Sequence, residues 1–185
     1  MSTSRMSPAD ARRWRKAGSF TDITELTARW LEGKIGSFPE NLPNCGPDEE
    51  TRPLIPALTT LCRAGYLTTT SQPGLDEVVG GRHWQQRAAV TGVVRDGALH
   101  RRLMKAARGA GLLVASREIA VTVVNGVEYT WFGGCPDLRF VRECWSVTSS
   151  QGRDEVTGAL PLTIVSPHYG PAGQNLWNTL VQAVS

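Results

Sequence analysis

The chain has 185 residues, of which 41% are hydrophobic and 20% charged, with 19 glycines and 11 prolines. This length suits one domain with its own core, and the composition excludes a disordered chain, a collagen-like repeat and a membrane-spanning run of about 18 apolar residues. Residues 1–36 carry the whole net charge of +3, with seven Lys and Arg against four acids. The remainder of the chain is neutral, which argues against a broad nucleic-acid surface.

Residues 1–20 are predicted to form a basic arm or helix, and residues 21–185 a single folded domain. A solvated helix face explains the charge of residues 1–20 better than phosphate contact does. No apolar run follows the basic residues, as a secretory signal would require, so we expect a cytoplasmic protein. The four cysteines form no CxxC pair and have no histidine at ligand spacing, so we expect reduced thiols and no zinc site.

Three helices are expected before the first strand. A capping serine followed by a proline predicts a helix over residues 8–16. Thr21 opens a second helix with an apolar face, and residues 35–50 are rich in Pro, Gly and Asn and read as a loop. A third helix is predicted at about 52–64, where Gly65 provides a stop signal.

The pattern then changes to one typical of strands. Residues 66–70 are aromatic and β-branched and predict a strand, followed by a turn at 71–74 and a polar loop through Gly81. Residues 84–94 are predicted to be a second strand. An amphipathic helix is expected over residues 96–109.

Asn125-Gly126 lies between two alternating segments and predicts a type I′ hairpin, because both turn residues need positive φ. The remaining segments are expected to be a strand at 137–145, a polar connector at 146–158, a strand at 160–166 and a closing helix at 174–184. Helices and strands mix without regular βαβ alternation. We therefore predict an α+β domain with a mainly antiparallel or mixed sheet flanked by helices.

The chain carries no standard catalytic motif: GxGxxG after a strand, GxxxxGK[ST], HExxH and GxSxG are all missing. The helix at 96–109 has four cations opposite its apolar stripe, namely Arg101, Arg102, Lys105 and Arg108. Any amphipathic surface helix shows this pattern, so nucleic acid is not an expected partner.

The segment Gly65–Gly74 combines a helix stop, a short strand and a run of hydroxyl side chains before Ser71-Gln72-Pro73. Ligand sites in sheet proteins often lie at such strand ends, although hydroxyls before Pro-Gly also serve simple turns. Upstream, the acidic residues 48–50 precede a helix. They can cap that helix, or they can bind a cation or a pair of ribose hydroxyls.

Four motifs follow one another in a definite order: Glu50-Thr51, the run from Thr68 to Pro73, Gln86-Arg87 and Tyr129-Thr130-Trp131. From about Ile23 to Val141, this order and spacing resembles the C-terminal regulatory domain of eukaryotic methylenetetrahydrofolate reductase. The resemblance implies a similar α+β fold. The catalytic barrel of that enzyme has no counterpart in these 185 residues, so folate reduction is not implied.

The regulatory domain of that family binds S-adenosylmethionine and its demethylated product, S-adenosylhomocysteine, as allosteric ligands. Carried over by position, the resemblance implies a ligand-binding site in the 21–185 domain that needs no cofactor. The implied ligand-binding residues are Glu50, Thr51, Thr68, Ser71, Gln72, Pro73, Gln86, Thr130 and Trp131.

Three functions remain open at this point. The first is a freestanding sensor or accessory domain for S-adenosylmethionine, S-adenosylhomocysteine or a related adenosyl ligand. The second is a small enzyme acting on an adenosyl or nucleotide substrate in the same pocket, with candidate acids and bases Glu50, Asp76, Glu77 and His83 near a bordering 74–83 loop. The third is an interaction module with a decayed pocket, whose basic N-terminal residues 1–20 contact a protein partner or a second copy; no membrane is expected.

Overall fold

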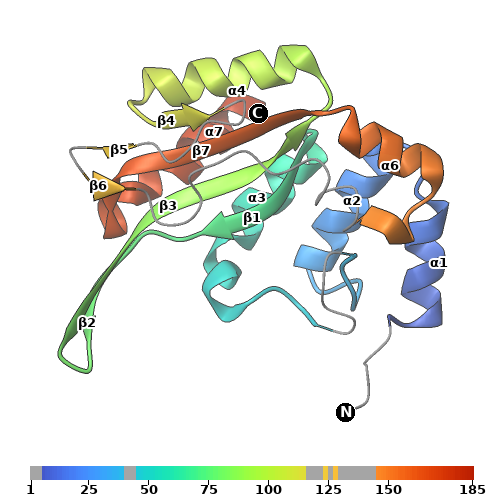
Figure 1. Ribbon diagram of the computed structural model, residues 1–185, viewed down its shortest axis with the longest axis horizontal. Helices are drawn as coiled ribbons and strands as arrows, with labels where there is room; N and C mark the ends of the chain where they lie inside the picture. The colour runs from blue at the N-terminus through green and yellow to red at the C-terminus, as the bar shows by residue number, and fades with distance from the viewer. Residues whose placement is uncertain (1–5, 40–44, 116–122, 125–126, 129–144) are drawn as a thin grey trace.

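An antiparallel β-sheet stands at the centre of the molecule, with helices around it (Figure 1). The computed structural model describes residues 6–39, 45–115, 123–124, 127–128 and 145–185. In this part of the chain the main sheet has the order β1-β3-β7-β4, and β2 also pairs with β3. Its strands are β1 (Tyr66–Gln72), β2 (Leu75–Val79), β3 (Arg82–Val94), β4 (Leu113–Ala115) and β7 (Leu160–Tyr169). Each pairing in it is antiparallel, so the predicted α+β class is confirmed.

The helices form two groups around this sheet (Figure 1). The α-helices of the described chain are α1 (Pro8–Lys16), α2 (Phe20–Leu31), α3 (Ile55–Arg63), α4 (Gly97–Gly109), α6 (Ser150–Thr157) and α7 (Asn175–Val184). Three short 3-10 helices are η1 (Glu49–Leu54), η2 (Trp145–Val147) and η3 (Gly170–Gln174). The helices predicted at 8–16, from Thr21, at 96–109 and at 174–184 are confirmed, with start or end points that differ by one residue.

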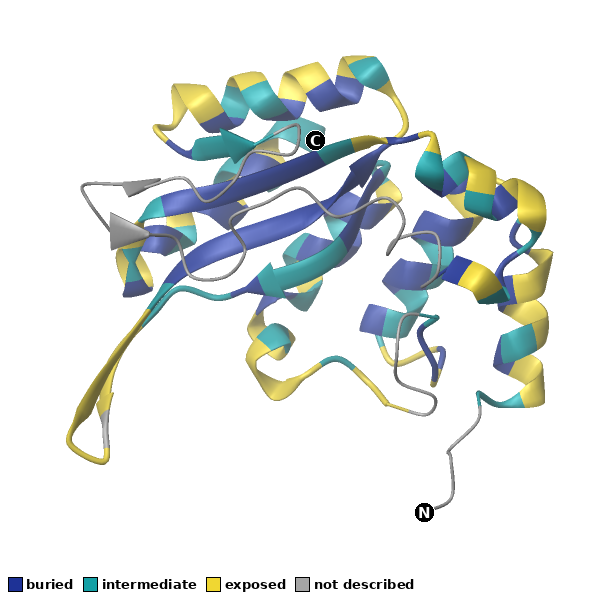
Figure 2. Ribbon diagram, viewed as in Figure 1, coloured by how far each residue is buried: buried dark blue, intermediate teal, exposed yellow. Residues whose placement is uncertain are grey.

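One face of the sheet carries the larger core. The apolar stripes of α3, α4 and α7 pack there against β3 and β7, as the periodicity of the sequence predicts. Leu58, Leu103, Leu162, Ile164 and Leu176 are each 0–1% exposed. The centres of β3 and β7 are accordingly buried, as Figure 2 shows.

A second core joins the N-terminal helices to the other face of the sheet. Trp14 of α1 is fully buried with Ile23 of α2, Leu67 of β1 and Trp145 of η2. The rings of Trp14, Phe38 and Trp145 meet edge-on, with centroids 5.4–5.9 Å apart. The N-terminal basic segment therefore contributes a buried side chain to the fold, while Arg12, Arg13, Arg15 and Lys16 are exposed.

Among the described strands β1 lies at the edge of the sheet, and its ladder with β3 is interrupted once. Thr68 lies opposite Gly92 and Thr70 opposite Thr91, so Thr69 is an extra residue on the β1 side. This arrangement is a β-bulge, which bends the strand and increases its twist. β1 then continues through Gln72, so the turn predicted at 71–74 begins two residues later than expected.

The polar loop predicted through Gly81 is wrong. Residues 75–79 form β2, which pairs with the first residues of β3 across a two-residue turn. The turn residues Gly80 and Gly81 have φ of 58° and 77°, the positive values that a type I′ hairpin requires. This hairpin projects from the body of the molecule, and residues 76–78 and 80–85 are exposed (Figures 1 and 2).

The polar connector predicted at 146–158 is also wrong, because residues 150–157 form α6. Ser149 caps this helix by accepting a hydrogen bond from the backbone N–H of Gly152 at 2.9 Å. The Ser149 hydroxyl also donates to the carbonyl of Ala17 at 2.7 Å. The helix buries only Gly152 and Val156, so it has almost no apolar stripe for the sequence to reveal.

The two strands flanking Asn125-Gly126 pair as predicted. β5 (Val123–Val124) and β6 (Val127–Glu128) are antiparallel, with Val124 opposite Val127. The turn itself lies outside the described residues, as does the strand expected at 137–145 apart from Trp145. In the described part of the chain, every helix is too short or too polar to cross a bilayer.

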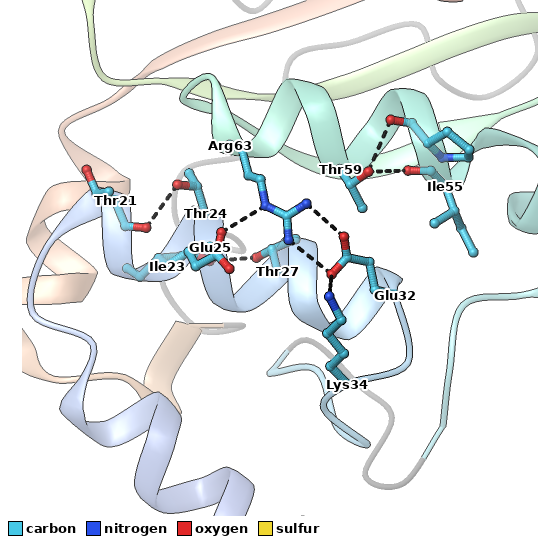
Figure 3. A network of polar contacts seen from close by, with 11 residues as sticks. Thr21, Ile23, Thr24, Glu25, Thr27, Glu32, Lys34, Ile55, Thr59 and Arg63 are labelled. Carbon is cyan, nitrogen blue, oxygen red and sulfur yellow. Dashed lines mark hydrogen bonds and ion pairs between the residues drawn. The ribbon is translucent and has the colours of Figure 1, made fainter.

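An ion-pair network joins α2 to α3 (Figure 3). The guanidinium of Arg63 donates to Glu32 through two nitrogens, at 2.7 and 3.0 Å, and to Glu25 at 3.0 Å. Lys34 contacts the same Glu32 carboxylate at 2.7 Å. The hydrogen bonds from Arg63, followed by those from Lys34, lower the pKa of Glu32 from 4.5 to about 2.

Glu32→Gln is expected to make the free energy of unfolding depend less steeply on pH under acidic conditions. Because folding lowers the pKa of Glu32, its ion pairs add to the free energy of unfolding above about pH 4.5, and this contribution is lost as the pH falls toward about 2. Arg63 is 42% exposed, so solvent screening limits the effect to about 1 kcal/mol or less. Urea unfolding of both proteins across this pH range measures it, and a constant difference between them would contradict the assignment.

Candidate ligand-binding site

A cavity of about 320 Å³ lies beside the edge strand β1. Its walls come from the C-terminal half of α2, the segment leading into η1, the start of α3 and the outer side of β1. The volume falls at the lower end of the range for small-molecule sites, about 300–1,000 Å³.

The polar wall is β1 itself, from Thr68 through Gln72. No strand pairs with the outer edge of β1 in the described chain, so alternate backbone N–H and C=O groups face away from β3. The bulge at Thr69 presents two adjacent threonine side chains where a regular strand would present one. The wall therefore offers backbone donors and acceptors together with hydroxyls.

Several of these side chains are held by neighbours. Thr68 lies 3.3 Å from the sulfur of Cys62, and burial raises the pKa of that thiol. Gln72 is 1% exposed and donates from Nε2 to the carbonyl of Arg87 at 2.6 Å. Thr69 donates to the carbonyl of Thr91 at 3.3 Å. Fixed side chains of this kind keep the shape of the wall constant, which lowers the entropy cost of binding.

The opposite wall is aromatic. The rings of Trp30 and Phe38 stack with centroids 4.5 Å apart and planes inclined by 30°. The indole N–H of Trp30 donates to the carbonyl of Cys45 at 2.9 Å, which ties α2 to the segment before η1. Such a surface suits a flat heterocycle, and its electron-rich faces also attract cations.

The charge of the cavity is negative. Asp48 and Glu50 are its only charged lining residues among those described. Both lie where the chain enters η1, whose first turn is closed by a 3.0 Å hydrogen bond from the N–H of Thr51 to the carbonyl of Asp48. Two carboxylates beside an aromatic wall favour a ligand with positive charge or paired hydroxyls. In the described residues no cluster of three or more acidic, His or Cys side chains could hold a metal ion.

Most of the site residues implied by the resemblance meet at this cavity. Glu50, Thr51, Thr68, Ser71, Gln72 and Gln86 line it. Pro73 follows the end of β1 and does not line it. Thr130 and Trp131 lie outside the described residues. The cavity thus brings together residues from three separate motifs.

The loop expected to border the pocket at 74–83 does not do so. Asp76, Glu77 and His83 belong to the projecting hairpin and line no part of the cavity. His83 and Asp76 pair with each other at 2.5 Å on the surface of that hairpin. Of the acids and bases considered for catalysis, the cavity contains Glu50.

Sequence reasoning missed the aromatic wall. Trp30 reads as a core residue because it shares a helix face with Ile23, and Phe38 sits in a segment that reads as a loop. Asp48, by contrast, belongs to the acidic residues 48–50, for which the sequence leaves both capping and ligand binding open. A stacked pair formed by residues 30 and 38 depends on how α2 lies beside β1, and no local pattern signals it.

Comparison with known proteins adds a family but no activity. No curated protein matches the sequence. One family model, described as Domain of unknown function (DUF6919), matches residues 9–185. This match covers nearly the whole chain, and the protein therefore belongs to the DUF6919 family.

Proposed function

We propose that this chain is a binding domain for S-adenosylmethionine or a closely related adenosyl ligand, acting as a sensor or an accessory domain. One observation carries the proposal: six residues implied by the resemblance line a single acidic, aromatic-walled cavity. They come from three segments of the chain, so neighbouring positions in sequence do not explain why they meet.

The chemistry of the cavity suits such a ligand in three ways. The stacked rings of Trp30 and Phe38 offer a flat apolar surface to an adenine ring. Carboxylates accept hydrogen bonds from ribose hydroxyls, and the hydroxyl side chains of β1 suit the amino-acid end. S-adenosylmethionine carries one net positive charge because of its sulfonium. Among the described residues, the lining contains Asp48 and Glu50 and no Lys, Arg or His.

Binding is favoured over catalysis by the composition of the cavity. A general acid-base mechanism needs a titrating group within hydrogen-bond reach of the reacting atoms. Glu50 is an exposed carboxylate in a short helix, and the described lining offers no histidine or cysteine beside it. The cavity is therefore equipped to hold a ligand rather than to transform one.

Glu50→Gln is expected to weaken binding of S-adenosylmethionine by about tenfold, because a charge-assisted hydrogen bond becomes a neutral one. Binding of the uncharged thioether S-adenosylhomocysteine should weaken less. Isothermal titration of the purified chain with each ligand measures both effects.

Glu49→Gln is the matched control. Glu49 is the preceding residue of η1, has the same charge and does not line the cavity, so this variant should bind as the wild type does. The absence of binding heat with S-adenosylmethionine, S-adenosylhomocysteine and adenosine would overturn the proposal. Mass spectrometry of the ligand after incubation separates a sensor, which returns it unchanged, from an enzyme.

A further inference from the structure

The projecting hairpin is the most exposed regular element of the described chain. It comprises β2 and the first half of β3, residues 75–86, and is called the arm below. The arm extends away from the body of the molecule, at the lower left of Figure 1, and most of its residues are exposed (Figure 2). A two-stranded ribbon without a covering layer is marginally stable in water.

The arm also exposes large apolar side chains. Val78 is 70% exposed and Trp84 is 54% exposed, the two highest values among the large hydrophobic residues described. Glu77 lies opposite Trp84, and Val78 lies opposite His83, so Trp84 and Val78 point to opposite faces of the ribbon. An exposed tryptophan on a projecting strand is a typical anchor of a protein interface.

One edge of the arm is open for further pairing. β7 pairs with β3 only from Arg87 onward, so residues 82–86 have no paired strand on that side in the described chain. The two-residue turn makes Val79 and Arg82 a hydrogen-bonded pair. Hydrogen-bonded and non-bonded pairs alternate from there, so the backbone N–H and C=O of His83 and Gln85 face this open edge.

The open edge of β3 is self-complementary. If a second copy pairs with it antiparallel about Trp84, the two tryptophans face each other at a non-hydrogen-bonded position, where side chains lie closest. His83 then faces Gln85 of the other copy, and Arg82 faces Gln86. At this seam, the contact between residues 82–86 of the two copies, no two like charges lie opposite each other.

The outer edge of β2 is unsuited to the same pairing. Its central residue is Glu77, and antiparallel pairing about that residue places Glu77 against its own copy, with Asp76 nearby. Like charges directly opposite each other destabilise a strand pair. Acidic side chains on an edge strand are a known protection against unwanted pairing, so β2 is the protected edge.

We propose that the open edge of β3, centred on Trp84, is a dimerisation site for a second copy of this chain. The two arms form a four-stranded antiparallel ribbon with β2 on its outside. The dimer is closed, because a two-fold axis through the Trp84 pair uses the same edge from both copies. This inference does not depend on what the cavity binds.

Sedimentation equilibrium of the full chain from low to high micromolar concentration tests the proposal. A reversible monomer–dimer equilibrium is expected. Gln85→Pro should raise the dimer dissociation constant by about tenfold or more. Proline removes the N–H that residue 85 donates to the other copy, and the two-fold axis repeats this change, so two hydrogen bonds between the copies are lost. The N–H of Gln85 does not serve the β2 ladder, so the arm itself should remain.

Val78→Pro is the matched control. Its N–H faces the outer edge of β2, so this variant carries the same backbone change away from the seam and should dimerise as the wild type does. Trp84→Thr provides a second seam variant that keeps the strand conformation, and it should also weaken the dimer. A wild-type protein that stays monomeric, forms open polymers, or dimerises equally well with both seam substitutions overturns the proposal.

Discussion

Trp14→Ala is expected to lower the free energy of unfolding by about 3–5 kcal/mol. The side chain is fully buried, and its indole N–H donates to the carbonyl of Ser37 at 2.9 Å. Its ring also contacts Phe38 and Trp145 edge-on. Alanine would leave a large cavity and would remove this buried hydrogen bond, and both effects destabilise. Urea unfolding followed by circular dichroism measures the loss.

The loss expected for Trp14→Ala is large compared with the total stability of a domain. A typical domain has a total stability of about 5–15 kcal/mol, so the substitution removes a large part of it. Arg15→Ala, on the exposed side of the same helix, is the control and should change stability by no more than about 0.5 kcal/mol. A loss below about 1 kcal/mol for Trp14→Ala would mean that α1 does not belong to the cooperative unit.

Gly92→Ala is expected to cost about 3 kcal/mol and to remove ligand binding as well. Gly92 lies in the middle of β3, opposite Thr68 at the bulge. A Cβ there would collide with the backbone carbonyl of Leu67 and would lie 2.9 Å from the Cα of Thr68. Because these atoms are backbone, β1 must shift as a whole, and its shift moves the polar wall of the cavity.

Thermal unfolding and ligand titration of this variant report the two consequences separately. Gly109→Ala is the opposite control, since a Cβ at this last residue of α4 meets nothing within 4 Å. Alanine favours a helix over glycine, so this variant should gain about 0.5 kcal/mol and bind normally. A Gly92→Ala protein with wild-type stability would show that β1 can move away from β3 at little cost.

Those parts of the fold with strong local patterns could be predicted from the sequence. The helices α2, α4 and α7 have apolar stripes at helical spacing, and the buried run of β7 contains Leu162, Ile164 and Val165. By contrast, α6 buries two residues, one of them a glycine, so it carries no stripe. The hydrogen bond from the capping residue Ser149 to the carbonyl of Ala17 is a tertiary contact, and local sequence patterns do not reveal it.

The sequence does contain a hairpin signal between β2 and β3, but the polar residues around it favoured a loop. Val78-Val79 and Arg82-His83 flank Gly80-Gly81, and a glycine pair between two short runs is a recognised hairpin turn. The charged residues around it suggested a loop, because half-buried strands alternate polar and apolar residues. An arm exposed on both faces has no buried side to impose that alternation.

One wall of the candidate site could likewise be predicted from the sequence, and the other could not. The β1 wall follows from the hydroxyl run at the end of a buried strand, which the sequence displays directly. The aromatic wall arises from two residues eight positions apart on a helix and a loop, and only the packing of α2 against α3 brings them to β1. Local pattern therefore predicts one side of the cavity, and tertiary packing determines the other.

The bulge in β1 makes the three consecutive threonines unequal. Thr68 is paired in the register that begins at Tyr66, and Thr70 is paired in the register that ends at Gln72, while Thr69 belongs to neither. A chain with two threonines at this point could keep every pair of the ladder and lose only the bend and one hydroxyl. The pairing of the sheet therefore needs only two of the three threonines, and the third changes the shape of the cavity wall. If the cavity binds a ligand as we propose, relatives that differ in the length of this run should differ in what they bind before they differ in fold.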